Sequence, residues 1–363
     1  MRNTNKKGFT IVELVVVVAV IAILAAVLIP TVSGIIKKAN IASDTAVAKN
    51  MNAALAEYTA ENGEPESFTE VLNAIEKYGF VISSLNAKAN GNLYAWDKEN
   101  NQIVYLDSEF KAIYQNVDFD FDDLCFVVAD SSVQLPDGSE SVALTADPTY
   151  LKNALAAGGD IAIADDIKVT GETATDKNFV AADNAVVNFG DNNIVLDMSG
   201  EGANYSGLWI EDASNVVING KNGGITVAND QKDNMELYGI VLENANGADP
   251  ITVTISGGKY AVGGQVVYAR GYNITVNITG GYFESFNEDN VYYGGICPVL
   301  NAKNGANNKF VLSGGTFVNF DISEDGLADT CAKLGNDVIT IADGYKVVEE
   351  AHGTDTWYIV VPK

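Results

Sequence analysis

The chain has little of the chemistry on which many enzymes rely. It contains one histidine, His352, three cysteines and only two arginines. A single histidine argues against Ser-His-Asp or Cys-His catalysis and against multi-histidine metal sites. An odd number of cysteines does not indicate a disulfide framework. Cys297 and Cys331 can pair if neighbouring coils stack them, and buried free thiols are the simpler interpretation.

Positive charge is also scarce. The 22 basic residues stand against 48 acidic ones, which gives a net charge of −26. Such a charge repels phosphate backbones and anionic membrane surfaces, so no nucleic-acid partner is expected. Hydrophobic residues make up 47% of the chain and charged residues 19%, a balance typical of a folded protein. With 363 residues the chain is long enough for more than one structural unit.

Charged residues are missing altogether from Leu14 to Ile36, a run of 23 positions. As a helix this run is about 34 Å long, which is enough to cross a bilayer. The basic residues before it favour a cytoplasmic N-terminus. A secretory signal fits less well, because the run is long, carries Glu13 at its start and lacks a clear cleavage site. A plain membrane anchor is the other alternative.

The residues around the start of this run form a motif. KKGFTIVE, from residue 6, ends a short basic leader and resembles the class III signal of type IV prepilins and pseudopilins. The resemblance covers roughly residues 6–60. It implies that prepilin peptidase cuts between Gly8 and Phe9 and that Phe9 becomes N-methylated. Glu13 is then the fifth residue of the mature chain, and Pro30 is the twenty-second, where many pilins carry a proline that loosens the helix.

The resemblance also explains Glu13. An ionised glutamate at the mouth of an apolar run costs roughly 2–3 kcal/mol or more without a partner. In the family picture, cleavage frees the amine of Phe9, and this amine meets Glu13 of the neighbouring subunit in a filament. The pair promotes assembly and sets axial register. Glu13 and Pro30 are therefore the expected assembly residues, and the expected partners are prepilin peptidase, other pilin subunits, the assembly machinery and the membrane.

The helix is expected to continue well beyond the bilayer. No glycine or proline interrupts residues 35–61, and Asn62-Gly63 is a typical helix stop. A helix over 9–62 is roughly 80 Å long. We therefore expect a leader at 1–8 and a transmembrane and filament-core helix at 9–62. The protein is expected in the bacterial cytoplasmic membrane before assembly and in an extracellular surface filament afterwards.

Residues 63–146 are expected to form a small αβ segment similar to the one that follows the long helix of many pseudopilins. Residues 67–78 predict an amphipathic helix, with Ser67 as its cap and Glu70 completing a capping box. Residues 93–107, LYAWDKENNQIVYLD, predict two strands around a polar turn.

The acidic run DFDFDD at 118–123 raises the possibility of calcium. It offers oxygen ligands at the first, third and fifth positions of an EF-hand loop, but Asp123 stands where glycine is required and Ala129 replaces the closing glutamate. A strand with Phe119 and Phe121 facing inward is the preferred interpretation. No cofactor is expected, and calcium bound outside an EF-hand stays open as the exception.

Residues 147–363 are expected to form a surface domain of repeating strands. A short helix is predicted between Asp147-Pro148 and Gly158-Gly159. Repeated segments follow, such as YGIVLENANGADPITVTISGGKY. Each combines a strand, an Asn/Gly-rich corner, an alternating strand, a Gly-Gly pair and an aromatic residue. Gly-Gly pairs recur at intervals of 23 and 34 residues, as in the coils of a solenoid. The alternation in 251–255 and 274–278 predicts inward rows in register, and the corners can form asparagine ladders.

This pattern resembles the right-handed parallel β-helix of the pectate-lyase-like group over about residues 147–345. The predicted fold is thus a long pilin-type α-helix, a small αβ segment and a mostly-β right-handed parallel β-helix. An antiparallel β-sandwich or jelly roll is the alternative.

Many proteins of the pectate-lyase-like group cleave polysaccharides, so the resemblance raises the possibility of an enzyme. In that group the lyases use carboxylate-bound calcium and a basic residue, usually arginine, and Arg270 is the only arginine after the leader. A surface ion pair is the simpler role for it. The hydrolase branch typically combines Asn-x-Asp with Gly-His-Gly and Arg-x-Lys, and the last two motifs are absent. Asp165-Asp166 is best interpreted as a solvated turn. We therefore expect no enzymatic activity.

Aromatic residues near the Gly-Gly corners suggest a binding role. Exposed rings can stack on sugars, although most of these rings are expected in the core. The possible ligand-binding residues are Arg270, Tyr282, Tyr292 and Tyr293. The function expected from the whole sequence is a subunit, minor or at the tip, of a type IV pilus or pseudopilus-like filament with an acidic head for adhesion. The alternative is a membrane-anchored β-helix protein that binds glycans or cleaves polysaccharides. Glycans or a host surface are the possible partners of the head.

Overall fold

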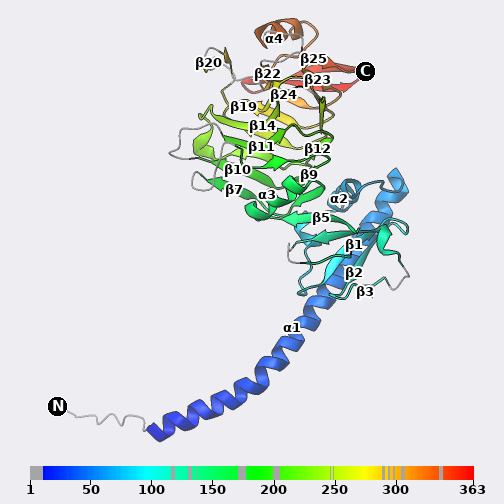
Figure 1. Ribbon diagram of the computed structural model, residues 1–363, viewed down its shortest axis with the longest axis vertical. Coiled ribbons are helices and arrows are strands. Elements are labelled where there is room, and N and C mark those ends of the chain that lie inside the picture. Colours follow the sequence, from blue (N-terminus) through cyan, green and yellow to red (C-terminus); the bar gives the residue numbers. More distant parts are fainter. Residues whose placement is uncertain are drawn as a thin grey trace, which may run out of the picture.

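In the computed structural model a long helix leads into a tall stack of β-strands (Figure 1). The N-terminal half of the helix stands clear of the rest of the molecule. The structure describes residues 11–115, 119–129, 133–136, 138–170, 177–198, 205–245, 247, 249–287, 291–292, 295–296, 299–303, 307–334 and 338–363.

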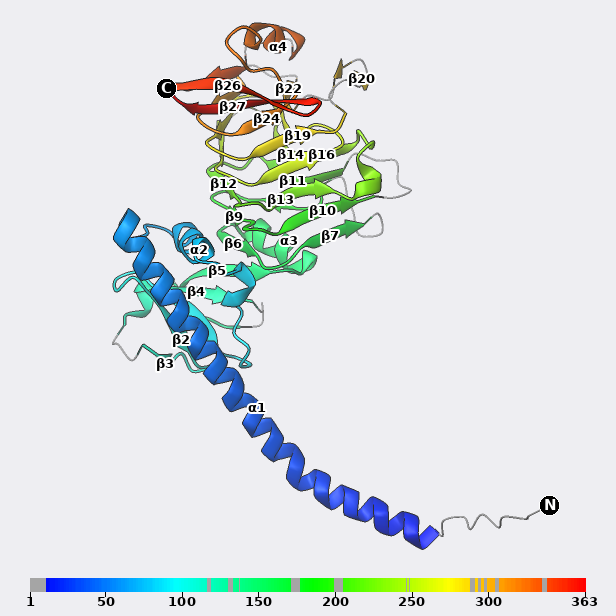
Figure 2. The same ribbon diagram turned by 180° about the vertical axis from the view of Figure 1, so that it is seen from behind.

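Helix α1 runs from Ile11 to Asn62 and passes through Pro30 without a break. It curves along its length (Figure 2). Its end is the predicted one: Gly63 donates its N–H to the carbonyl of Thr59 at 3.0 Å and has a φ of +94°, which suits glycine. Only the second half of α1 packs against the head. Its buried side chains are Asp44, Ala48, Met51, Ala54 and Leu55.

Helix α2 (Phe68–Lys77) confirms the second predicted helix. The Ser67 hydroxyl accepts the N–H of Glu70 at 3.3 Å, as expected for a cap. The Glu70 carboxylate accepts the N–H of Glu66 at 3.0 Å, so the return bond of the capping box is shifted by one residue. The predicted apolar side is buried and consists of Phe68, Val71, Leu72 and Ile75. A 3-10 turn, η1 (Ile82–Leu85), follows.

Strands β1 (Leu93–Asp97) and β2 (Gln102–Leu106) pair antiparallel around the predicted turn. β3 (Ala112–Tyr114) flanks β2, and β4 (Leu124–Val128) flanks β1. The strand predicted within 118–123 is wrong. Residues 121–123 form a 3-10 turn, η2 (Phe121–Asp123), because Asp120 caps it by accepting the Asp122 N–H at 3.3 Å. The Phe121 side chain is 38% exposed, and its ring stacks on the buried Phe126 at 6.5 Å, while Phe119 packs against the same core cluster.

The small sheet does not end at β4. β4 pairs in parallel with β5 (Glu140–Thr145), and β5 pairs in parallel with β6 (Asp160–Ile163). The ladder therefore passes into the later strands without interruption. Helix α3 (Pro148–Ala157) lies beside this passage and starts as predicted, with the Asp147 carboxylate accepting the Tyr150 N–H at 2.7 Å.

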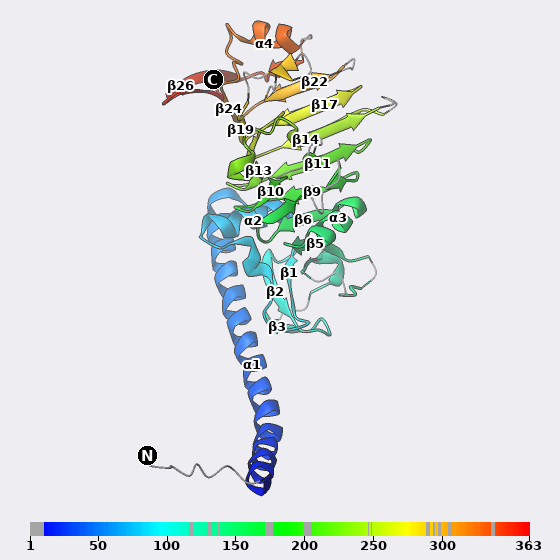
Figure 3. The same ribbon diagram turned by 90° about the vertical axis from the view of Figure 1, so that its left-hand side faces the viewer.

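Beyond β6 the chain visits three sheets in turn, and most strands pair in parallel (Figure 3). The twelve-stranded sheet continues from β6 through β9 (Val186–Asn188), β12 (Val216–Asn219), β15 (Ile251–Ile255), β18 (Ile274–Ile278), β23 (Lys309–Leu312) and β25 (Ile339–Ile341). The eight-stranded sheet contains β7 (Ile167–Thr170), β10 (Asn193–Asp197), β13 (Gly224–Val227), β16 (Lys259–Val262), β19 (Tyr282–Ser285), β24 (Thr316–Val318), β27 (Asp355–Pro362) and β26 (Tyr345–His352). The five-stranded sheet contains β8 (Val180–Ala181), β11 (Tyr205–Glu211), β14 (Leu237–Asn244), β17 (Val267–Gly271) and β22 (Leu300–Lys303).

The predicted inward rows are confirmed by the register. Ile251 lies opposite Ile274, and the two following alternate positions of β15 and β18 match in the same way. All six side chains are at most 2% exposed. The parallel pairing contradicts the antiparallel sandwich that the sequence left open as an alternative. Parallel strands buried on their inner face place one continuous apolar core between the three sheets.

Aromatic rings form a column inside the stack. Tyr260 and Phe283 stack with centroids 5.3 Å apart, and Phe283 and Phe317 stack at 5.1 Å. Phe189 meets Tyr260 edge-on at 6.5 Å. The aromatics that follow the Gly-Gly corners at these positions are therefore core residues.

Asparagines repeat at the corners, as expected. Asn215 donates its side-chain amide to Asn184 at 3.3 Å, and Asn307 donates to Asn273 at 3.0 Å. All four have φ between +55° and +65°, a conformation that asparagine tolerates better than most residues. Each of these side-chain hydrogen bonds thus links one corner to the next.

The far end of the stack carries different elements. Helix α4 (Leu327–Leu334) lies over it, and β26 and β27 form an antiparallel hairpin that joins β24. The chain also contains the 3-10 turn η3 (Asn229–Gln231) and a short antiparallel strand pair, β20 (Val291–Tyr292) and β21 (Gly295–Ile296).

Candidate functional site

The first half of α1 is an exposed apolar surface. Every large apolar side chain from Ile11 to Ile36 is between 48 and 81% exposed. Among the described residues, α1 is the one helix long and apolar enough to cross a membrane. Exposed apolar surface on this scale marks a site that lipid or another protein covers.

The sequence-predicted assembly residues lie on this surface. Glu13 is the acidic residue in the first turn of α1, where its negative charge faces the positive end of the helix dipole. Pro30 lies inside the helix and has no N–H to give to the preceding turn. One residue later, the Thr31 hydroxyl donates to the carbonyl of Val27 at 2.9 Å. Gly8 and Phe9 lie outside the described residues.

The second half of α1 is joined to the head by a buried carboxylate. Asp44 is 1% exposed, and one of its oxygens accepts the Ala89 N–H and the Tyr105 hydroxyl, each at 2.9 Å. The Tyr94 hydroxyl donates to the backbone carbonyl of Asp44 at 3.1 Å. Burial, helped by the charge of Asp44, raises the pKa of Tyr94, so this tyrosine stays neutral.

Asn52 makes a second connection between helix and sheet. Its side-chain amide donates to the carbonyl of Ile103 at 2.8 Å and accepts the N–H of the same residue at 2.6 Å. The side chain thus pairs with β2 as a neighbouring strand does. Together Asp44 and Asn52 fix the head to α1 at two points.

Arg270 lies on the outer surface of the five-stranded sheet. Its guanidinium is 3.3 Å from the Glu243 carboxylate and lies 5.7 Å from the centre of the Trp209 ring. The Lys177 ammonium lies over the same ring at 4.7 Å and is bound to Glu243 at 3.2 Å. Arg270 is therefore part of a surface ion-pair cluster, as the simpler interpretation of the sequence holds.

Tyr282 lies on a different surface, that of the eight-stranded sheet. Its hydroxyl donates to Glu284 at 3.0 Å, and its ring meets Trp357 edge-on at 5.5 Å. His352 stacks on the other ring of this pair, Trp357, at 3.6 Å. The sequence-predicted binding residues Arg270 and Tyr282 are thus on separate sheets and do not form one site. Tyr292 belongs to β20, and Tyr293 lies outside the described residues.

The cysteines and acidic residues form no evident reactive centre in the part of the chain that the structure describes. Cys125 and Cys331 are buried free thiols, and burial raises the pKa of Cys125 to about 12. Cys297 lies outside the described residues, as does Asp118 at the start of the acidic run. Across the described ranges no three His, Cys, Asp or Glu side chains converge as a metal site. The Asp165-Asp166 turn is exposed, as expected.

Several important residues were not found from the sequence. Asp44, Asn52 and Glu76 connect separate parts of the fold, and Trp209 and Trp357 organise the two surface clusters. Asp44 gave the one usable signal, since it is an acidic residue that falls on the buried side of α1. The others depend on partners distant in sequence, which no local pattern reveals.

Comparisons with known proteins place the N-terminal features in a family. Residues 3–29 match the model described as the prokaryotic N-terminal methylation motif. The type IV wide pilus major component PilA4 of Thermus thermophilus is 31% identical over 118 residues, which is 31% of this chain and 88% of that protein. The type IV major pilin protein PilE1 of Neisseria gonorrhoeae is 37% identical over 123 residues, or 28% of this chain and 74% of that protein.

The chain belongs to the type IV pilin family. It spans 59% of the length of the fimbrial protein of Neisseria meningitidis serogroup A, at 32% identity over 102 residues. No solved structure shows a significant match. The motif, the apolar helix and these relatives fit a membrane-anchored precursor that becomes part of an extracellular filament. The matches cover less than a third of this chain, so they leave most of the β-strand stack without a counterpart.

Proposed function

We propose that the protein is a minor or tip subunit of a type IV pilus or pseudopilus-like filament, processed by prepilin peptidase between Gly8 and Phe9. The division of α1 carries this proposal. Its first half exposes apolar side chains throughout, and its second half is fixed to the head by Asp44 and Asn52. Lipid covers the exposed half before assembly, and the helices of other pilin subunits cover it in the filament.

In this proposal Glu13 is the assembly residue. Its carboxylate pairs with the Phe9 amine of the neighbouring subunit, so a charge that is costly alone in an apolar surrounding becomes favourable in the filament. Pro30 leaves one carbonyl of the preceding turn without its helical partner, which allows the helix to loosen locally when it packs.

The head supports a minor or tip position. We propose that the strands from β6 onward form a right-handed parallel β-helix, and that the chain divides into a leader (1–8), the helix (9–62), a small αβ segment (63–146) and the β-helix domain (147–363). Such a stack is bulky beside one helix (Figure 3). A helical filament in which every subunit carries such a stack has little room for it. A position at the tip, or at a few sites along the filament, has enough room.

The acidic stack is proposed to act in adhesion, towards glycans or a host surface. Polysaccharide cleavage, the alternative from the sequence, finds less support. Arg270 forms an ion pair with Glu243. A residue that takes a proton from a polysaccharide must approach the substrate without a competing carboxylate, so this pairing argues against Arg270 as the base.

Two measurements test the filament proposal. Mass spectrometry of the N-terminal peptide, from cells with the native peptidase, should find N-methylated Phe9 as the mature terminus. An uncut chain, or a cut elsewhere, would contradict processing at this site. Quantitative immunogold labelling of sheared filaments should then find the head at ends or at sparse positions, and dense regular labelling would contradict the minor or tip role.

A further inference from the structure

A pocket of about 610 Å³ lies in the small αβ segment, away from the stack. Its walls come from three places: the segment 85–93 between η1 and β1, the turn between β2 and β3, and the end of β4 with residues 133–134. The volume lies within the range of about 300–1,000 Å³ that is usual for small-molecule sites.

The described side chains that line the pocket are uncharged. Asn86, Asn90, Asn92, Ser108 and Gln134 supply amide and hydroxyl groups, and Phe110 supplies an aromatic surface. None of the 14 lining residues that the structure describes carries a charge, although the chain has a net charge of −26. A charged ligand would lose its hydration here without gaining an opposite charge, so the lining favours a neutral one.

The walls are held in place before any ligand arrives. In the 85–93 segment, the Ala89 N–H is bound by the buried Asp44, and the Asn92 side chain donates to the Tyr105 hydroxyl at 2.8 Å. Asn40 on α1 donates to the carbonyl of Lys88 at 3.1 Å. A preorganised wall reduces the entropy that binding costs.

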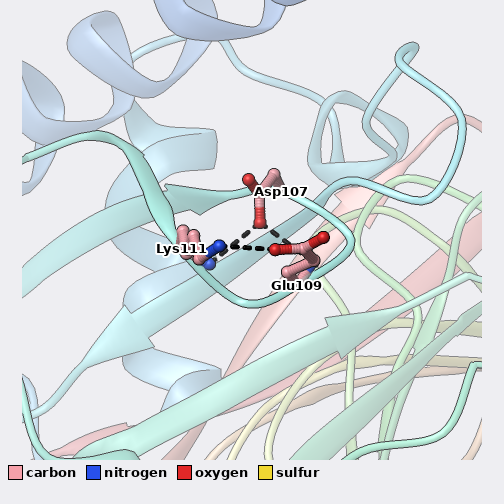
Figure 4. Close-up of polar contacts among 3 residues, drawn as sticks. All are labelled: Asp107, Glu109 and Lys111. Atoms are coloured by element: carbon pink, nitrogen blue, oxygen red, sulfur yellow. Dashed lines mark hydrogen bonds and ion pairs between the residues drawn. The ribbon is translucent and has the colours of Figure 1, made fainter.

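The opposite wall is fixed by the turn shown in Figure 4. The Asp107 carboxylate accepts the N–H groups of Glu109 and Lys111 at 2.9 and 3.0 Å, and the two latter side chains form an ion pair. The charged side chains of Glu109 and Lys111 thus pair with each other. The two residues between these charged positions, Ser108 and Phe110, line the pocket.

Phe110 is the unusual member of this wall. Its φ is +60°, a left-handed conformation that costs a bulky residue of the order of 1–2 kcal/mol and that glycine or asparagine adopts more readily. The ring is placed edge-on to Phe126 at 5.7 Å. The ring is partly buried against the core cluster that contains Phe126, and it lines the pocket as well.

From these observations we infer that the pocket is a binding site for a neutral saccharide. The amide side chains offer paired donors and acceptors that match neighbouring sugar hydroxyls. The Phe110 ring offers a surface for the C–H face of a pyranose. The site lies in the αβ segment, so its binding is independent of whether the chain is processed or enters a filament.

Saccharide binding can be measured on the full chain in a detergent without a sugar headgroup. The probes are an array of neutral oligosaccharides beside a matched array of uronate and sialylated ones. Retention of neutral members alone is the expected result. Retention of no neutral member, or equal retention of acidic ones, would overturn the inference.

Variants of the full chain then locate the site by calorimetry with a retained neutral oligosaccharide. Asn90→Ala and Gln134→Ala should each lower the affinity about five- to tenfold, because each removes hydrogen bonds to the sugar. Phe110→Asn, which suits the left-handed turn but lacks the ring, should lower it at least as much. Asn50→Ala, an exposed position on α1, is the matched control and should change nothing.

One further variant separates this pocket from the stack. Tyr282→Ala removes a partly buried tyrosine of the eight-stranded sheet and should leave the affinity unchanged. Loss of binding in Tyr282→Ala, with full binding in the three pocket variants, would place the saccharide elsewhere and overturn the assignment. Processing at Phe9 is read separately by mass spectrometry, so failure of the filament proposal and failure of this one give different results.

Discussion

Glu76 is expected to make the contact between α2 and the strand stack depend on pH. The side chain is 4% exposed, and its Oε1 atom has no hydrogen-bond partner among the described residues. It lies directly against the loop between β9 and β10, since a Cβ added to Gly190 would be 2.5 Å from this oxygen. Burial, then repulsion from Asp191, raises the pKa of Glu76 from 4.5 to about 7, and Lys221 opposes this only in part.

The size and sign of the effect follow from this pKa. The folded chain holds a proton on Glu76 that the unfolded chain releases above pH 4.5. The contribution of Glu76 to the free energy of unfolding is therefore largest below pH 4.5. The free energy of unfolding should fall as pH rises from about 4.5 to 7 and then level off. At about 1.4 kcal/mol per pKa unit, the rise of the pKa from 4.5 to about 7 corresponds to a total loss of about 3.5 kcal/mol. In equilibrium terms the contact opens about 300 times more often.

Hydrogen exchange of the α2 amides, corrected for the intrinsic pH dependence, measures this opening at pH 5 and pH 8. Wild-type protein should show much weaker protection at pH 8. Glu76→Gln keeps the shape and removes the charge, so its protection should be nearly the same at both pH values. Glu64→Gln, at an exposed position, is the control and should behave as wild type. An unchanged pH dependence in Glu76→Gln would refute the reasoning.

Three further predictions concern other parts of the chain. Glu13→Gln should be processed normally but yield few filaments, and a wild-type yield of sheared filaments would contradict its assembly role. Asp44→Ala leaves the Ala89 N–H and the Tyr105 hydroxyl without their acceptor and should lower the free energy of unfolding in urea by about 3 kcal/mol, whereas Ser43→Ala should change it little. Phe283→Ala opens a cavity in the aromatic column and should cost about 3–5 kcal/mol by the same measurement; a loss below 1 kcal/mol would show that the column collapses to fill the gap.

The sequence was sufficient where one signal acts locally. The end of α1 at Asn62 and the start of α3 after Asp147 follow from glycine and capping chemistry within a few residues. The inward rows of β15 and β18 follow from strict alternation, because a shift by one residue would expose every isoleucine.

The sequence was insufficient where a local side-chain bond competes with a strand pattern and where partners are distant. The acidic run at 118–123 alternates as a strand does, yet the Asp120 side chain bonds the local backbone and makes a turn instead. The separation of Arg270 from Tyr282 depends on which sheet each strand joins, and this is set by corner geometry. The sequence also does not predict the pairing of β4 with β5, because no residue pattern in either strand specifies which strand it pairs with.

The unbroken ladder from β3 to β25 has a mechanical consequence. A filament subunit whose head hangs on a flexible linker can swivel when its ligand is pulled. Here tension applied at the far end of the stack passes from strand to strand into β1 and β2, and then through the Asn52 and Asp44 contacts into α1. Torque on the head is therefore delivered to the helix as rotation, so the direction of the head reports the orientation of the helix beneath it.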